Sequence, residues 1–158
     1  DLFMDVFDDE ILSFWDYLEK EGVRYILIGG FATNFHGYSR ATADMDLWIE
    51  DSPENRQRLR RAIKNHGSGD YEMIETMQMV AGWTELRLKN NFTLDLMTSV
   101  KGLENIPFDE CYELAVIAKI EEIPIRFLHY NHLVPRPSAS PRIKAHLDLE
   151  ELARIRES

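Results

Sequence analysis

The stretch YILIGGFATNFHGYSRATADMDLWIE (residues 25–50) decides the fold. Its first four residues are large and apolar, which is typical of a short buried strand that ends at Gly29 and Gly30. A glycine pair can turn tightly and lets a ligand approach the backbone closely. Residues 31–36 can then form a short helix that ends at Gly37. Such a helix would direct free N–H groups and the positive end of its dipole at an anion, and phosphate suits that position.

A second strand is predicted over residues 44–49. Side chains alternate along a strand, so Asp44 and Asp46 share one side while Met45 and Leu47 face a core on the other. Two neighbouring carboxylates repel each other unless a cation lies between them, and their hard oxygen atoms suit Mg²⁺ or Mn²⁺. A glycine turn alone is common in α/β proteins, and an Asp-X-Asp pair alone is often solvated surface. Their combination at this spacing favours a phosphate and metal site.

These motifs carry a resemblance to a known family. Residues 28–30 and 44–47, separated by thirteen positions, resemble the signature of the DNA polymerase β-like nucleotidyltransferase superfamily. The wider string over residues 27–46 is similar to its small bacterial and archaeal branch, which includes minimal nucleotidyltransferases and abortive-infection type toxins. Residues 92–97 resemble the strand of the third carboxylate, and residues 142–149 resemble the closing helix. The resemblance implies an α+β (α/β) fold with a polymerase β-like core, which is a small mixed β-sheet flanked by helices.

The resemblance also implies a reaction and a set of site residues. A nucleoside monophosphate would pass from an NTP to an acceptor, and pyrophosphate would be released. Gly29 and Gly30 would hold the triphosphate, and Asp44 and Asp46 would bind both metal ions. Asp95 would complete the coordination of the metal ion that activates the acceptor hydroxyl.

Arg40 and Thr42 lie between the glycine pair and the first aspartate. A guanidinium and a hydroxyl at these positions could bind phosphate oxygens of the nucleotide. Each also has a structural alternative, because Thr42 could be an ordinary sheet residue and Arg40 could pair with one of many surface acids.

Asp95 lies in a predicted hairpin. Residues 83–88 and 92–97 flank an Asn-Asn pair, and asparagine tolerates the left-handed backbone of a tight turn. Asp95 is a charge in an otherwise apolar strand, and a carboxylate in such a place needs a partner. The partner is either a metal ion or acceptor hydroxyl, or Arg87 across the hairpin, and the upstream aspartates favour the first.

The composition sets outer bounds. A chain of 158 residues with 44% hydrophobic content predicts one domain, with a core over about residues 22–128 and a helical segment over about residues 129–158. The single cysteine, Cys111, excludes a disulfide framework and a cysteine-rich zinc site, and is predicted to fill a helix interior. No apolar run reaches membrane-spanning length and no signal peptide is visible, which predicts a soluble cytoplasmic protein.

The net charge of −10 opposes non-specific binding of nucleic acid, because an acidic surface repels a phosphate backbone. A local basic stripe remains on a helix that is predicted to begin after Ser52 and to end at Gly67. The stripe consists of Arg56, Arg60 and Lys64. It is either a solvated helix face, the more common case, or a contact surface for RNA or a nucleotide.

The remaining elements complete the layout. They are a helix capped by Asp8 or Asp9 and ended by Gly22, a helix from Asp109 through Leu114, strands over residues 116–120 and 123–128 joined by a Glu-Glu turn, and a final helix that starts at Ser140. Arg142 and Lys144 of the final helix could reach a nucleotide, although the proline-rich stretch before them departs from the family pattern.

Two classes of function follow. One is a nucleotidyltransferase that modifies RNA, such as tRNA, or a protein, as a toxin of a toxin–antitoxin or phage-defence pair. The other is a non-catalytic module with the same fold that acts through a partner chain. An antibiotic-modifying enzyme is a narrower alternative, since an acidic surface suits a cationic aminoglycoside. No enclosing domain is visible, so an antitoxin partner or a homodimer is expected.

Overall fold

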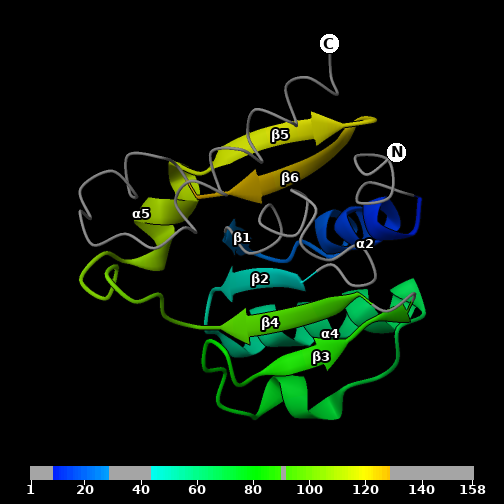
Figure 1. Ribbon diagram of the computed structural model, residues 1–158, viewed down its shortest axis with the longest axis horizontal. Coiled ribbons are helices and arrows are strands. Elements are labelled where there is room, and N and C mark those ends of the chain that lie inside the picture. Colours follow the sequence, from blue (N-terminus) through cyan, green and yellow to red (C-terminus); the bar gives the residue numbers. More distant parts are fainter. Residues whose placement is uncertain (1–8, 29–43, 90–91, 129–158) are drawn as a thin grey trace.

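The computed structural model describes residues 9–28, 44–89 and 92–128, with Asp9, Glu10 and Asp44 described through their backbone alone. The rest of the chain is the thin grey trace in Figure 1. The predicted glycine turn, the short helix after it and the C-terminal helix lie outside the described residues.

A six-stranded mixed sheet organises the described chain (Figure 1). Its spatial order is β3-β4-β2-β1-β6-β5. Strand β1 is antiparallel to β2 and parallel to β6, whereas β2 is parallel to β4, and β3–β4 and β5–β6 are antiparallel pairs. The strands are β1 (Tyr25–Ile28), β2 (Asp44–Ile49), β3 (Glu85–Arg87), β4 (Thr93–Met97), β5 (Val116–Ile120) and β6 (Ile123–Phe127). The predicted α+β class with a mixed sheet is confirmed.

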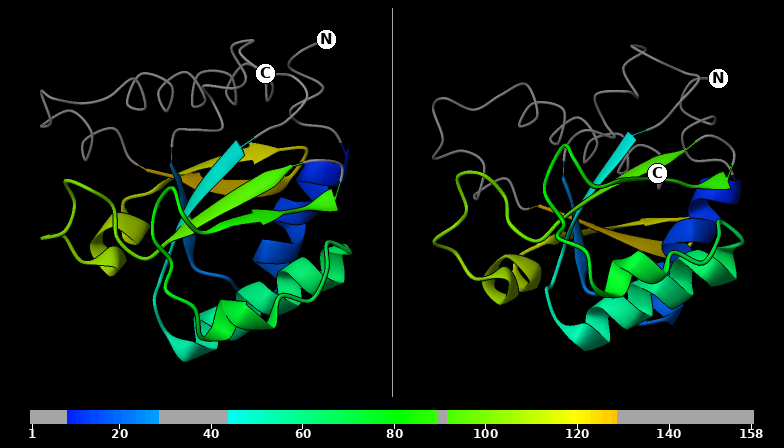
Figure 2. Two further views of the ribbon diagram at one scale, coloured as in Figure 1. Left: turned by 60° about the horizontal axis from the view of Figure 1, so that its bottom comes forward. Right: turned by 90° about the horizontal axis from the view of Figure 1, so that it is seen from below.

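Two helices, α2 (Asp9–Lys20) and α4 (Pro53–His66), cover one face of the sheet (Figure 2). The predicted ends of α4 are confirmed. The Ser52 Oγ accepts a hydrogen bond from the Asn55 N–H at 3.1 Å, and Gly67 adopts a left-handed φ of 91° that only glycine takes readily. None of the helices in the described part of the chain has the length and apolar character needed to cross a bilayer.

Both faces of the central strands are buried. The face under α2 and α4 carries the larger core, to which Met45 and Leu47 contribute as predicted. The opposite face carries a smaller core that joins strand residues to α5 (Phe108–Glu113) through the buried Cys111, which fills the helix interior as expected. Strand residues of this second core include Ile26, Ile28, Trp48 and Met97.

Helix α5 begins differently from the prediction. Pro107 precedes its first residue, Phe108, so Asp109 lies within the first turn and is not the cap. Its carboxylate forms an ion pair with Arg24, whose guanidinium also lies 4.6 Å from the ring centroid of Tyr112. Proline pre-sets the backbone for helix entry without a side-chain cap, which explains the shift.

The turn between β5 and β6 strains its backbone. Glu121 and Glu122 have φ angles of 52° and 71°, a conformation that glycine and asparagine adopt more easily. The double substitution Glu121→Asn, Glu122→Gly is therefore expected to raise the free energy of unfolding by about 1 kcal/mol. Urea titration would measure this gain, and an unchanged midpoint would show that the turn is not strained.

Tyr25 gives a pH dependence that can be tested. Its side chain is fully buried and its hydroxyl oxygen accepts the Arg126 N–H at 3.2 Å. Burial raises the pKa of Tyr25 well above its usual value, so the folded protein keeps the phenol proton after the unfolded chain has lost it. Its contribution to stability is complete below about pH 10 and is lost as the pH rises further.

The Tyr25→Phe variant should lack this alkaline loss. Between pH 9 and pH 11, the difference in unfolding free energy between wild type and variant is expected to shrink by roughly 1 kcal/mol. Urea titrations at the two pH values would measure it. If the difference in unfolding free energy is the same at both pH values, a group other than Tyr25 causes the loss of stability at alkaline pH.

Candidate functional site

Two of the predicted carboxylates, Asp46 and Asp95, lie next to each other. Strands β2 and β4 are parallel, and their register pairs Asp46 with Asp95. Both residues are nearly buried, with exposed fractions of 6% and 8%. Residues paired across adjacent strands point to the same face, with Cβ atoms about 5 Å apart. This face is opposite to the one that buries Leu94 and Leu96 against the helices.

The other predicted site residues are described only in part. The backbone of Asp44 pairs with Thr93, two positions before the Asp46–Asp95 pair, and its side chain is not described. The predicted phosphate-binding residues lie outside the described residues; these are Gly29, Gly30, Arg40 and Thr42. The structure therefore brings together two of the three predicted metal ligands and the backbone of the third.

A loop residue binds Asp95 directly. The Gly82 N–H donates a hydrogen bond of 2.7 Å to the Oδ2 atom of Asp95. The hairpin register places Glu85, and not Arg87, opposite Asp95, while Arg87 lies opposite Thr93. The alternative of an ion pair straight across the hairpin to Arg87 is therefore not supported by the register.

Glu85 is an acid that the sequence interpretation missed. It lies on β3 directly opposite Asp95, so Asp46, Asp95 and Glu85 form a row across three strands. Glu85 is exposed and flanks the buried Leu86. The alternation around Leu86 was visible in the sequence, but the pairing with Asp95 depends on the length of the hairpin loop.

The donor set suits a hard divalent cation. Two adjacent carboxylate groups supply the oxygen ligands that Mg²⁺ and Mn²⁺ prefer. Within residues 9–28, 44–89 and 92–128, no three acidic, imidazole or thiol side chains converge as a complete ligand set. Asp46 and Asp95 are two of the three carboxylates predicted from the sequence, and the side chain of the third, Asp44, is not described.

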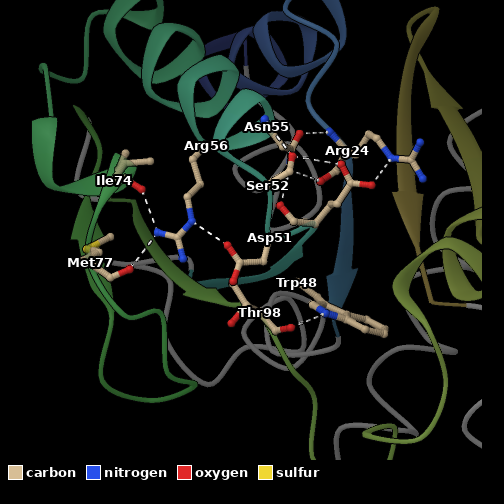
Figure 3. Close-up of polar contacts among 10 residues, drawn as sticks. Arg24, Trp48, Asp51, Ser52, Asn55, Arg56, Ile74, Met77 and Thr98 are labelled. Carbon is tan, nitrogen blue, oxygen red and sulfur yellow. Dashed lines mark hydrogen bonds and ion pairs between the residues drawn. The ribbon is translucent and has the colours of Figure 1, made fainter.

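A polar network holds the ends of the central strands (Figure 3). Asn55 is fully buried, and its side chain accepts from the Arg24 N–H at 2.8 Å and donates to the carbonyls of Arg24 and Glu50. The Trp48 Nε1 donates to the Thr98 carbonyl at 3.2 Å, which links β2 to the residue that follows β4. These bonds help to keep the Asp46–Asp95 register.

The basic stripe on α4 has a structural role. Arg56 points inward and donates from Nη1 to the carbonyls of Ile74 and Met77, at 3.0 and 2.7 Å, and from Nε to Asp51 at 2.8 Å (Figure 3). Arg60 binds Asp70 and Glu75 at 2.7 and 2.5 Å; the hydrogen bonds from Arg60 lower the pKa of Asp70. Only Lys64 of the stripe is exposed.

Neither predicted role of the stripe describes how its cations lie in the fold. The stripe is neither a simple solvated face nor a surface free to bind RNA. Carbonyls of the following segment accept hydrogen bonds from Arg56, and acids of the same segment form ion pairs with Arg60. From sequence alone, a charged residue at helical spacing is predicted to be exposed. Arg56 points inward only because the fold of residues 68–79 brings acceptors to it.

Comparison with protein-family models, curated proteins and solved structures gives no match.

Proposed function

We propose that this chain is a metal-dependent nucleotidyltransferase with a polymerase β-like core, which transfers a nucleoside monophosphate from an NTP to RNA or a protein. The observation that carries the proposal is the side-by-side placement of Asp46 and Asp95 on parallel strands. Carboxylates side by side on adjacent strands offer the paired hard oxygen ligands that a divalent cation binds.

The proposed chemistry follows from the residues. Asp44, Asp46 and Asp95 would hold Mg²⁺ or Mn²⁺, which supplies neutralisation of the triphosphate charge and activation of the acceptor hydroxyl when bound. The rigid central strands would keep the carboxylates in place, since both faces of β2 and β4 are packed. The Gly82 N–H would fix one oxygen of Asp95 and so hold the orientation of the carboxylate.

The glycine pair before β2 supports the same function. Residues 29–30 follow the buried β1 directly, and β1 pairs with β2 in antiparallel register from Tyr25↔Ile49 to Ile28↔Asp46. The end of β1 therefore lies beside Asp46. A phosphate group held by the backbone at the glycine pair would start next to the candidate metal ligands.

The test is transfer of label from each of the four α-³²P-NTPs, with Mg²⁺, into total cellular RNA and protein. The Asp46→Asn variant serves as the inactive control, and Glu113→Gln, which removes an exposed carboxylate on α5, serves as the matched active control. Label in one fraction that disappears only in Asp46→Asn would support the enzyme and identify the acceptor class. If folded wild-type protein transfers no label, the catalytic proposal is rejected, and the alternative of a non-catalytic module that acts through a partner chain remains.

A further inference from the structure

The turn formed by residues 80–83, of sequence VAGW, is apolar and exposed. Trp83 has an exposed fraction of 86% and Val80 of 50%, whereas Trp15 and Trp48 are buried. A tryptophan side chain offers one of the largest apolar areas of any residue, so leaving it in water gives up much stabilisation. Packing among the residues that the structure describes therefore does not explain why a tryptophan stands at position 83.

Hydrogen bonds hold this turn in one position. The N–H groups of Trp83 and Thr84 both donate to the Val80 carbonyl, at 2.9 and 3.1 Å. The Val80 N–H donates to the Thr84 Oγ1 at 2.8 Å, and the Thr84 carbonyl accepts from Leu96 of β4. The indole is thus presented on a fixed backbone, which lowers the entropy lost when a ligand contacts it.

The turn lies at the candidate site. The Gly82 N–H reaches the Asp95 Oδ2 at 2.7 Å, which places the turn on the face of the sheet that carries Asp46 and Asp95. Trp83 follows Gly82 directly, so its Cα lies within roughly 7 Å of that carboxylate oxygen. The backbone that carries the indole therefore lies beside the candidate site.

We propose that Trp83 is a stacking surface for the nucleobase of the substrate at this site, a step that rests on the proposed nucleotidyl transfer. Aromatic side chains bind bases of any identity through their faces, and removing one weakens binding about 5-fold to 150-fold per base. The chain has a net charge of −10, so contacts to a phosphate backbone contribute little, and stacking is the favoured source of affinity. The base belongs either to the NTP or to a single-stranded RNA acceptor.

Tryptophan fluorescence tests the contact in the intact protein. Trp83 is the exposed one of three tryptophans, so titration with each NTP or with single-stranded RNA hexamers, in Mg²⁺, should quench its emission. The Trp83→Phe variant should lose the quenching but keep most of the affinity, because a phenyl ring still stacks. Inorganic tripolyphosphate, which has no base, should bind without quenching.

Calorimetry with the same probes separates the sources of the base. Trp83→Ala is expected to weaken the NTP or the RNA about 10-fold and to leave tripolyphosphate unchanged. The ligand whose affinity falls, NTP or RNA, is the one that supplies the stacked base. Ile117→Ala, which truncates a 52% exposed side chain on the opposite edge of the sheet, is the matched control and should change neither.

Other outcomes would overturn the inference in distinguishable ways. Unchanged affinity of Trp83→Ala for NTP and RNA, while tripolyphosphate binds in a manner sensitive to Asp46→Asn, would reject the stacking role alone. Loss of protein labelling in Trp83→Ala without any base-dependent quenching would assign the turn to a protein acceptor instead. No binding of any probe to folded wild-type protein would reject the stacking role and the proposed function together.

Discussion

The Asp46→Asn substitution is expected to lower the rate of nucleotidyl transfer by at least about 1,000-fold while the protein stays folded. Asparagine keeps the shape of aspartate but removes a negative charge and one strong metal-ligating oxygen. Asp46 lies in a row with Asp95, so its loss would leave the divalent ion with fewer anionic ligands at the point where charge develops. The rate of label transfer under single-turnover conditions measures the effect.

Metal-dependent stability gives an independent check on Asp46→Asn. A ligand that binds only the folded state stabilises it, so Mg²⁺ with an NTP should raise the Tm of the wild type. The same addition should raise the Tm of Asp46→Asn much less, and that of Glu113→Gln as much as the wild type. If the activity of Asp46→Asn stays within about 10-fold of the wild type, the proposed catalytic role of Asp46 is contradicted.

The Arg56→Ala substitution is expected to lower the free energy of unfolding by about 4 kcal/mol. The Arg56 side chain is almost fully buried, and it donates to the carbonyls of Ile74 and Met77. Alanine would leave these acceptors without their donor inside the protein and would also create a void beside α4. Chemical unfolding monitored by circular dichroism measures the loss.

Two companion variants separate charge from geometry at this position. Arg56→Lys keeps the charge but lacks the planar fork that reaches two carbonyls and Asp51 together, so it should recover less than half of the loss. Lys64→Ala removes an exposed cation of the same stripe and should change stability by less than about 0.5 kcal/mol. Equal effects of Arg56→Ala and Lys64→Ala would contradict the structural role of Arg56.

Local signals predicted much of the fold. Ser52 and Gly67 marked the ends of α4 because a helix end needs a capping acceptor or a left-handed residue, and both are local requirements. The bounds of β1, β2 and β5 also followed from short apolar or alternating runs. The start of α5 was wrong because Asp109 reads as a cap in the sequence, although it pairs with Arg24.

The parts that sequence did not predict depend on tertiary pairing. The order of the six strands and the register that pairs Asp46 with Asp95 follow from packing, which has no local signal. The same reason hid Glu85 and the inward direction of Arg56. In the candidate site, the family resemblance already implied one group of Asp44, Asp46 and Asp95, but only the sheet register shows that Asp46 lies directly beside Asp95.

The parallel pairing of β2 with β4 also has a consequence for how the protein forms. The bond from Trp48 to Thr98, beside this pairing, joins positions 50 residues apart. Contacts between distant positions must overcome the entropy of closing a long loop, so they form slowly and late. The carboxylate pair would therefore assemble only as the nascent chain completes β4, and a fragment that ends before residue 93 would contain Asp46 without its neighbour.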